Sequence, residues 1–318
     1  MKIKGVVFPG QGAQRQNMGV DFVEAYPEAA KIFDIASQSL GIDLLEINKG
    51  NSHTQTLSST VYAQPCIVVT EIAMYEVLKM QPDLAFAPEF FAGHSLGEYS
   101  ALVAANVISL ETAAQILYNV RGRLMQDAME NSDGAMAAVI IKDLPYAEIK
   151  QITNKHDIDI ANHNSLDQVV ISGLANDVDL AIADLKMQYE ASVRCVLLDV
   201  DSAFHSRHMQ SIGETFHQRM LEYKKEFNPK NLPKVLSNYT GDFYTADVDQ
   251  LIDLLSKQLY SEVKWQSNMQ NMLENVDGIV DGILELGPNR PLSGFFKTMG
   301  VRIQNVCNLR GLKKLKGE

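Results

Sequence analysis

The sequence predicts an α/β protein in which a large domain built on a parallel sheet carries a smaller inserted domain. Three observations support this fold class. Strand and helix patterns alternate over about the first 130 residues, a G-x-S-x-G motif joins an apolar strand to a helix, and a β-α-β-β-α-β order follows from about residue 134 to 200. We expect the large domain to comprise residues 1–132 and 201–318 and the insertion residues 133–200. With 318 residues, 46% of them hydrophobic, the chain can bury a sizeable core.

The N-terminal part is expected to alternate between strands and helices. Its elements are a buried strand from Ile3 to Phe8, a glycine-bearing loop from Pro9 to Gln14, a helix from Pro27 to Leu40, and a helix from about Gln64 to Met80. Gly41 is placed to cap the first of these helices, and Pro65 is tolerable in the first turn of the second. Alternation of this kind is typical of a parallel sheet covered by helices.

The G-x-S-x-G motif occupies residues 93–97, behind the apolar stretch from Glu89 to Ala92 and ahead of a helix expected from about Leu96 to Ala105. In this context it predicts a nucleophile elbow, which presents the Ser95 hydroxyl at the tip of a sharp turn. The adjoining helix N-terminus offers free N–H groups that can hold negative charge. The two glycines leave room for so tight a turn. A serine that only caps the helix is the alternative.

The middle of the chain predicts a ferredoxin-like unit. The expected elements are a strand (Ala135–Ile141), a helix (Pro145–Lys155), two strands (Ile158–Ala161 and Gln168–Ser172), a helix (Asp177–Tyr189) and a strand (Val193–Val200). Because helix and strand patterns resume from Ser206 to Val306, this unit is an insertion. A small domain set against a larger sheet creates a cleft, the usual place for a substrate.

Composition narrows the classes of function. The net charge of −11 argues against general nucleic-acid binding, and an acidic partner must therefore dock on a local basic patch. Two lysine clusters are candidates, with ordinary solvated lysines as the alternative: Lys224, Lys225, Lys230 and Lys234, and Lys313, Lys314 and Lys316.

Nothing in the sequence predicts a membrane segment, a disulfide or a metal site. No stretch reaches about eighteen uninterrupted apolar residues, and the apolar piece from Val6 to Phe8 is too short for a signal peptide. Cys66, Cys195 and Cys307 are odd in number and far apart, so we expect reduced packing residues. These features predict a cytoplasmic protein.

A serine nucleophile needs a base, and histidine is the usual one near neutral pH. Of the seven histidines, His205 stands at a loop-to-helix junction where a side chain can point into a cleft. Nearby His208 is an alternative that chemistry alone leaves open. His94 is adjacent to Ser95, but neighbours around an elbow point apart, so a packing role is expected. No acid stands at a diagnostic position, and a backbone carbonyl can orient the imidazole instead.

Arg121 is the second informative residue. Ser109 is expected to cap a helix that reaches about Met129 and carries an apolar stripe, with Arg121 at the edge of that stripe. A buried guanidinium needs an anion, because burying an unpaired charge costs roughly several kcal/mol. The forked N–H donors of a guanidinium match a carboxylate. A clamp for a substrate carboxylate is one reading. An internal salt bridge or an arginine that reaches water is the other.

The loop from Pro9 to Gln14 leaves the carboxyl end of the first strand, where α/β sheets place their ligands. The backbone N–H of Gln11 can serve as one oxyanion donor, with the N–H of Leu96, the residue after the nucleophile, as the other. The pattern Gly10-x-Gly12 lacks the further glycine and the acidic residue of a dinucleotide site.

Together these motifs resemble the malonyl-CoA:acyl carrier protein transacylases, from about Val7 to Leu292. The motifs that carry the resemblance are Pro9–Gln14, Gly93–Tyr99, Arg121-Gly122, Gly134–Ala138, Asn162 with Asn164-Ser165, Gln168–Gly173 and Phe204–Ser206. Fatty-acid members of the family usually carry a small polar residue where Phe204 stands. The segment from Ala203 to Met209 is therefore closer to the free-standing acyltransferases that serve polyketide synthases.

The resemblance implies an α/β-hydrolase-like large domain with the ferredoxin-like insertion. It assigns Ser95 as nucleophile and His205 as general base, with Gln11 and Leu96 forming the oxyanion hole. It also implies that Arg121 binds a malonyl carboxylate.

Further roles follow from the same resemblance. Asn162, His94 and Phe204 would line the substrate site. A backbone carbonyl near Val263–Trp265 would orient His205. At Lys264 the chain departs from the glutamine common in the bacterial fatty-acid enzymes.

The implied activity is transfer of a malonyl group from malonyl-CoA to the phosphopantetheine thiol of an acyl carrier protein, in fatty acid or polyketide synthesis. The expected partner is an acidic carrier protein that binds transiently, and no metal or bound cofactor is expected. Two alternatives stay open: an acyl hydrolase that edits carrier proteins, and a non-catalytic protein that docks on them.

Overall fold

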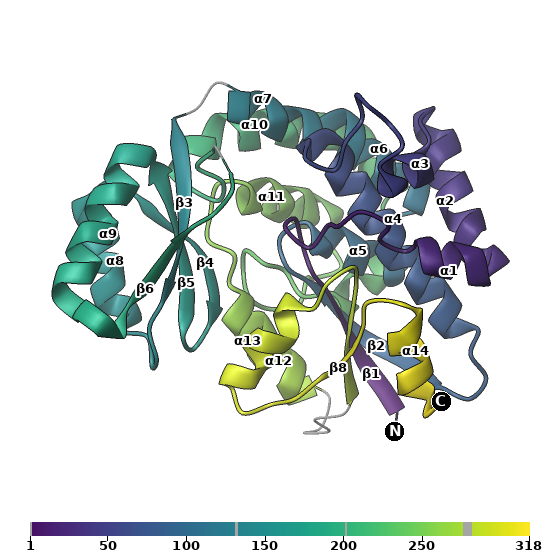
Figure 1. Ribbon diagram of the computed structural model, residues 1–318. Helices are drawn as coiled ribbons and strands as arrows, with labels where there is room; N and C mark the ends of the chain where they lie inside the picture. Colours follow the sequence, from purple (N-terminus) through teal and green to yellow (C-terminus); the bar gives the residue numbers. More distant parts are fainter. Residues whose placement is uncertain (1, 131–132, 201, 276–281) are drawn as a thin grey trace.

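The computed structural model describes residues 2–130, 133–200, 202–275 and 282–318 and contains two sheets (Figure 1). The larger sheet has four parallel strands in the order β2 (Ala85–Gly93), β1 (Lys2–Phe8), β7 (Ile283–Leu286) and β8 (Gln304–Val306). The smaller is antiparallel, with the order β4 (Asp159–Ser165), β5 (Gln168–Leu174), β3 (Gly134–Ile140) and β6 (Arg194–Leu197). The predicted α/β class, with its parallel sheet, is confirmed.

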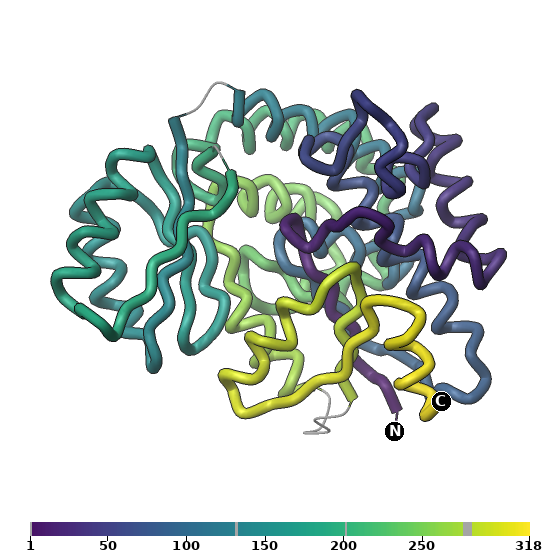
Figure 2. Tube along the Cα trace, in the orientation of Figure 1, coloured from purple at the N-terminus to yellow at the C-terminus, as the bar shows by residue number. Residues whose placement is uncertain are grey.

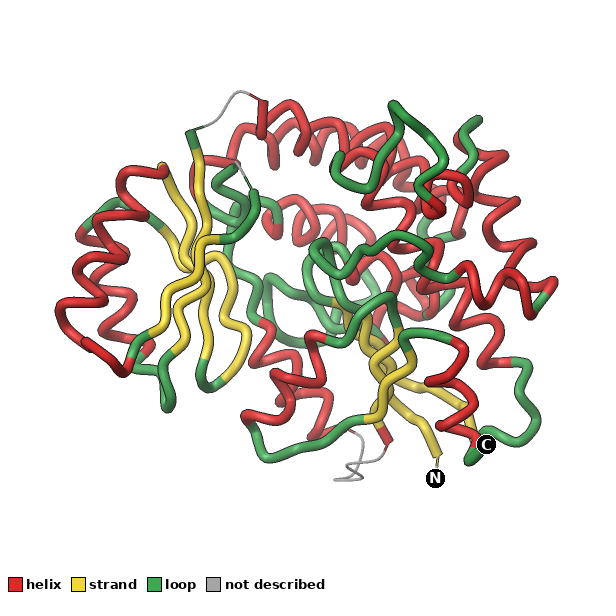
Figure 3. The backbone as a smooth tube through the Cα atoms, in the orientation of Figure 1, coloured by secondary structure: helices red, strands yellow, loops and turns green. Residues whose placement is uncertain are grey.

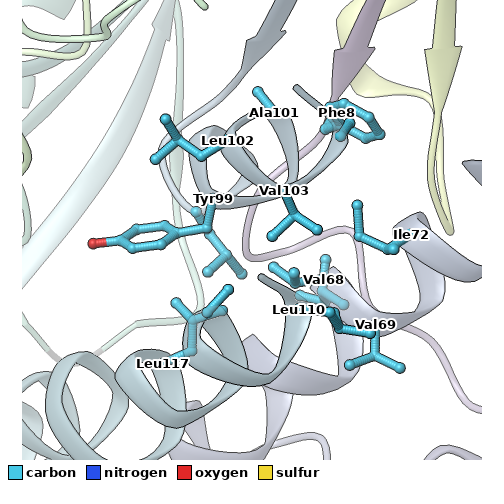
Figure 4. Close-up of a cluster of buried hydrophobic side chains, with 14 of the residues drawn as sticks. Phe8, Val68, Val69, Ile72, Tyr99, Ala101, Leu102, Val103, Leu110 and Leu117 are labelled. Atoms are coloured by element: carbon cyan, nitrogen blue, oxygen red, sulfur yellow. The ribbon is translucent and has the colours of Figure 1, made fainter. Parts of the chain in front are cut away.

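The larger sheet is covered on both faces. Side chains alternate along a strand, and in β1 Val6 and Phe8 join one hydrophobic cluster while Val7 joins another. The first cluster includes side chains of α4 (Thr60–Lys79) and α5 (Gly97–Ala104), as Figure 4 shows around Phe8. The second includes Trp265 and Met269 of α12 (Trp265–Asn275).

The remaining helices complete the large domain. They are α1 (Val20–Ala25), α2 (Pro27–Leu40), α3 (Leu44–Lys49), α6 (Leu110–Ile116), α7 (Gly122–Glu130), α10 (Gln210–Met220), α11 (Val248–Gln258), α13 (Pro291–Thr298) and α14 (Leu309–Lys316), with 3₁₀ turns at Arg207–Met209, Leu221–Glu226 and Pro229–Lys234. The prediction for α2 is confirmed at both ends, with Gly41 in the left-handed conformation at its C-terminus. Ser109 caps α6, as predicted, by accepting a hydrogen bond from Thr112 N.

The predicted start of α4 was wrong. The helix begins at Thr60, so Pro65 lies inside the helix and outside its first turn. Thr60 and Gln64 are buried polar side chains, which interrupt the apolar pattern that would have revealed the first turns. α4 is long and apolar enough to cross a membrane, but 83% of its most apolar 18-residue stretch is buried, as in the core helix of a globular fold.

The smaller sheet belongs to a βαββαβ unit. Helices α8 (Tyr146–Lys155) and α9 (Ala175–Tyr189) both lie on the face turned away from the large domain (Figure 3). The tube trace in Figure 2 shows this unit as a lobe beside the larger one. Residues 132 and 201, at the predicted domain boundaries, lie outside the described residues, so the boundaries stay a prediction.

Main-chain hydrogen bonds tie the two lobes together. The N–H of His163 in β4 donates to Val263 O at 3.0 Å, and Val263 N donates back to Ala161 O at 2.8 Å. The segment around Val263 therefore extends the edge of the small sheet by one short bridge. This pairing fixes the insertion against the large domain.

Between β2 and α5 the chain makes the predicted sharp turn. Ser95 has φ of 51°, a left-handed value that is uncommon outside glycine and is typical of a strained nucleophile turn. A Cβ at Gly93 would lie 1.9 Å from the carbonyl carbon of Gly97, and a Cβ at Gly97 would lie 2.3 Å from Phe8 O. Both glycines are therefore required by close backbone approach.

We predict that Gly93→Ala destabilises the protein by about 3 kcal/mol, because the added methyl group overlaps backbone that cannot move independently. The matched control is Gly294→Ala in α13, where an added Cβ meets nothing within 4 Å. Helix propensity predicts that this control stabilises by about 0.5–1 kcal/mol. Denaturant unfolding measures both changes. Equal stability of Gly93→Ala and the parent protein would contradict the packing account.

Candidate active site

The structure brings Ser95 and His205 together from positions 110 residues apart. Ser95 Oγ lies 2.8 Å from His205 Nε2. Ser95 stands on the turn after β2, and His205 follows the small domain, held by a hydrogen bond from its N–H to Leu259 O at 3.1 Å. His205 also has a left-handed φ, of 57°. Two strained residues that meet at hydrogen-bond distance are typical of a catalytic pair.

The other imidazole nitrogen faces a main-chain carbonyl. His205 Nδ1 lies 2.6 Å from Gln258 O, at the end of α11. Because a carbonyl only accepts, Nδ1 carries the proton, and Nε2 is left as the acceptor for the serine hydroxyl. A carbonyl takes the place of the acid of a triad, as the sequence allowed.

The predicted position of this carbonyl was wrong. We expected it near Val263–Trp265, but Val263 O accepts the N–H of His163 and so belongs to the bridge between the lobes. The orienting residue is Gln258, and the departure expected at Lys264 stays a prediction. Sequence spacing could not distinguish two nearby carbonyls.

A network of buried polar side chains forms hydrogen bonds to the turn that carries Ser95. The Gln258 side-chain Nε2 donates to Ser95 O at 3.1 Å and to Glu98 Oε2 at 2.5 Å. Asn238 accepts from Ser95 N at 2.6 Å and donates to Gly93 O at 2.7 Å. These contacts fix both sides of the nucleophile. The sequence did not predict roles for Gln258, Glu98 and Asn238; only Glu98, the residue directly after the motif, stood near a signal that could have revealed it.

Glu98 is fully buried, and burial raises the pKa of its carboxyl to about 7. Three donors offset the burial: the Tyr244 hydroxyl, the Gln258 amide and the Asn238 N–H. Glu98 therefore anchors the segments that carry Gln258 and Asn238 to the helix that follows the nucleophile.

Arg121 is buried, with 1% of its surface exposed, and within the described residues its Nε, Nη1 and Nη2 atoms have no hydrogen-bond partner. Its Cζ atom lies 5.6 Å from the centre of the Tyr99 ring, whose hydroxyl points away from the hydrophobic cluster in Figure 4. Neither alternative from the sequence holds in the described structure: the guanidinium makes no salt bridge and does not reach water. It is a buried cation ready to receive an anion.

A π-helical turn from Leu117 to Arg121 sets the position of this guanidinium. Such turns add one residue to a helix and recur at functional sites. The turn closes through Gly122 N to Leu117 O, and a Cβ on Gly122 would lie 2.5 Å from that oxygen. The regular apolar stripe predicted a continuous α-helix and did not indicate the extra residue of the π turn.

Burial and nearby positive charge act together on His205. Burial, together with the smaller effect of the Arg121 charge, lowers the pKa of its imidazole to about 3, although the hydrogen bond to the Gln258 carbonyl opposes this shift. The imidazole is therefore neutral and can accept a proton throughout the physiological range. Arg121 is therefore near enough to His205 for its charge to influence the imidazole.

The loop that carries Gln11 packs against the turn that carries Leu96. A Cβ on Gly10 would lie 2.3 Å from His94 O and 3.5 Å from Leu96 N, so the Pro9–Gln14 loop packs on the elbow. In the described part of the chain neither Gln11 N nor Leu96 N donates to a protein acceptor. The Gln11 side chain is fixed by Thr60 Oγ1 at 3.1 Å and by Gln64 Nε2 at 3.3 Å. Both N–H groups are available to a ligand.

The other predicted residues lie around this pair. His94 Nε2 is 2.7 Å from Asn164 Oδ1 and its ring packs edge-on against Trp265, which fits the expected packing role. Asn162 is buried at the bridge to Val263, and Phe204 is buried beside His205 in the main hydrophobic cluster.

His205 is the histidine that meets Ser95, and the remaining candidates lie elsewhere. His208 is exposed, and His156 pairs with Asp184 at 2.7 Å. Across the described ranges no group of three His, Cys, Asp or Glu side chains is arranged to hold a metal ion. The arrangement can perform nucleophilic acyl transfer by a serine with a histidine base beside a cationic pocket.

Comparison with known proteins agrees with this geometry. The acyl transferase domain family matches residues 6–282. The malonyl CoA-acyl carrier protein transacylase of Bacillus subtilis is 35% identical over 95% of this chain and 92% of its own length. The chain belongs to the malonyl-CoA:acyl carrier protein transacylase family.

Other members of this transacylase family extend the comparison. The polyketide biosynthesis malonyl CoA-acyl carrier protein transacylase of Bacillus subtilis is 33% identical over 91% of this chain and 94% of its own. The transacylase of Clostridium perfringens has a TM-score of 0.85 at 31% identity, covering 99% of this chain and 96% of that one. A malonyl-transacylase solved with its type II polyketide synthase acyl-carrier protein has a TM-score of 0.87 at 28% identity and covers all of both chains.

We predict that Ser95 stays reactive in mild acid. A base with an ordinary histidine pKa near 6.5 loses about tenfold of its neutral form by pH 5.5, whereas the lowered pKa of His205 keeps it neutral there. The measurement is the rate at which a fluorophosphonate modifies Ser95 between pH 5 and 8, with His205→Ala as the unreactive control. A level profile is expected. A tenfold fall centred near pH 6.5 would show that burial does not control this imidazole.

Proposed function

We propose that this protein transfers a malonyl group from malonyl-CoA to the phosphopantetheine thiol of an acyl carrier protein. The observation that carries the proposal is the buried, unpaired guanidinium of Arg121 close to the Ser95–His205 pair. An acyl group that ends in a carboxylate supplies the missing anion while its thioester faces the serine. The names of the relatives, which are malonyl transacylases over nearly their full length, support the same substrate.

In the first step His205 Nε2 takes the proton from Ser95 Oγ as that oxygen attacks the thioester carbonyl. The N–H groups of Gln11 and Leu96 hold the negative charge that develops on the carbonyl oxygen. When the intermediate collapses, the carbon–sulfur bond breaks, and the CoA sulfur leaves with the proton from His205. The product is a malonyl ester on Ser95.

In the second step the thiol of the carrier protein's phosphopantetheine arm gives its proton to His205 and attacks the serine ester. The same two N–H groups hold the second oxyanion. The ester bond breaks, His205 returns the proton to Ser95 Oγ, and the malonyl group leaves as a thioester on the carrier protein. Every proton is returned, so the cycle consumes no further reactant.

Other parts of the proposal follow from this chemistry. Thioester exchange needs no metal, redox group or bound cofactor. The carrier protein is an acidic, transient partner, which a chain of net charge −11 can engage only through a local basic surface. Asn162, His94 and Phe204 surround the acyl group.

Three free cysteines agree with a cytoplasmic enzyme. Relatives at 33% and 35% identity include polyketide and general transacylases, and a closer link to the polyketide enzymes stays a prediction.

We predict that mixing the protein with malonyl-CoA yields an acyl-enzyme heavier by one malonyl group, and that Ser95→Ala abolishes this adduct. Intact-protein mass spectrometry measures the change, and Ser206→Ala is the matched control, because Ser206 is buried nearby but its hydroxyl bonds to Ala203 O. Adding a holo carrier protein should discharge the ester to the carrier thiol. Release of free malonate instead would identify an editing hydrolase, and the absence of any adduct would identify a non-catalytic docking protein.

We predict that Arg121→Ala lowers kcat/KM for malonyl-CoA by about a hundredfold or more, since the loss of one member of a desolvated charge pair costs about 2–5 kcal/mol. Transfer from acetyl-CoA should persist, because an acetyl group makes no use of the guanidinium. Competition between the two thioesters measures the selectivity. If the variant still prefers malonyl-CoA, Arg121 does not bind the carboxylate.

A further inference from the structure

A second cationic site lies on the large lobe, away from the Ser95–His205 pair. It is a cavity of about 620 Å³ between the loops that follow β1 and β7, strand β8 and helix α14. Its lining includes four cations, Arg15, Arg290, Arg310 and Lys314, and the amides Asn289, Gln304 and Asn305. We infer that this cavity binds the nucleotide phosphates of the CoA substrate.

The charge of the cavity departs from that of the whole chain. The protein has 28 lysines and arginines against 39 acidic residues, yet among the described residues no acidic side chain lines this cavity. In the described residues none of its four cations forms an ion pair. The nearby Glu285 is buried, and its carboxylate is already held by Leu292 N and Ser293 N. Four cations without a direct ion pair around one cavity favour a ligand with several negative charges, although the charge of Glu285 acts on Arg290.

The walls of the cavity are already held in place. The Arg15 guanidinium donates from Nε to Pro288 O at 2.9 Å and from Nη2 to Cys307 O at 3.1 Å, which joins the loop after β1 to both other loops. Asn308 caps α14 by accepting from Gly311 N at 2.9 Å. Arg310 and Lys314 stand four residues apart and so share one face of this helix. A site held in this way needs little reorganisation to bind.

The position of the cavity fits a substrate with a long arm. Arg15 is on the same loop as Gln11, and its Nε donates to Pro288 O, so the loop that carries Gln11 also forms part of the cavity wall. The nucleophile and this cavity therefore lie at the same carboxyl edge of the parallel sheet. CoA carries its thioester at one end of a pantetheine arm and three phosphates with a nucleoside at the other. The cations match the phosphates, and the amides match the nucleoside.

The volume of the cavity falls within the range of about 300–1,000 Å³ that is typical of small-ligand sites. The inference rests on the proposed function for the identity of the ligand. A polyanionic nucleotide is the chemistry that the cavity itself selects.

The test uses the full chain and the double variant Arg310→Gln/Lys314→Gln, with Lys313→Gln as the matched control on the same helix outside the cavity. Acylation of Ser95 is measured with malonyl-CoA and with malonyl-pantetheine, which lacks the nucleotide. We expect the double variant to raise KM for malonyl-CoA by about tenfold, since it removes two phosphate contacts, and to leave malonyl-pantetheine and the control unchanged. Equal KM values for malonyl-CoA would overturn the inference. So would normal acylation combined with slower transfer to the carrier protein, which would assign the cavity to carrier docking.

A direct binding measurement separates this inference from the proposed function. Calorimetry with adenosine 3′,5′-bisphosphate reports on the cavity without any acyl transfer. We expect binding to the parent protein and to Ser95→Ala, and about tenfold weaker binding to the double variant. If no acyl-enzyme forms but this binding is present, the proposed transfer fails and the nucleotide site stands. If the parent protein acylates normally but does not bind the bisphosphate, the nucleotide site fails alone.

Discussion

The guanidinium of Arg121 carries a positive charge inside the protein, and no carboxylate among the described residues forms an ion pair or a hydrogen bond with it. Burial of such a charge is costly, and the Tyr99 ring and the charge of Glu98 offset only part of that cost. A π-helical turn, closed at Gly122, nevertheless holds the guanidinium there. A site of this kind favours an anionic ligand, which is the basis of the proposed malonyl specificity, and its positive charge adds to the effect of burial in keeping the neighbouring imidazole neutral.

In other serine enzymes an acidic residue orients the histidine. Here a main-chain carbonyl orients it, and side-chain amides hold the backbone of the nucleophile turn. The Gln258 carbonyl sets the tautomer of His205, and the side chains of Gln258 and Asn238 fix the backbone on both sides of Ser95. Glu98 joins these two segments beneath the turn. The bridge at Val263 fixes the small lobe beside the same site. The proton-transfer geometry therefore depends on backbone placed by the whole large lobe.

Local patterns in the sequence predicted the features that depend on local physics. The glycines and the strand-to-helix context predicted the strained turn at Ser95, and Gly41 marked the end of α2. Features that depend on three-dimensional contacts were missed or misplaced. Nothing in spacing showed that the carbonyl of Gln258, rather than one near Val263, would meet His205. The π turn before Gly122 is hidden in an even apolar stripe, and the buried polar side chains of Thr60 and Gln64 concealed the start of α4.

The most direct test of this account is a crystal structure of the protein after reaction with malonyl-CoA, trapped in the absence of a carrier protein. The account predicts an ester on Ser95 Oγ whose free carboxylate accepts two hydrogen bonds from the Arg121 guanidinium, with the ester carbonyl oxygen facing the N–H groups of Gln11 and Leu96. An acyl group whose carboxylate lies in solvent or on another cation, with Arg121 still unpaired, would contradict it.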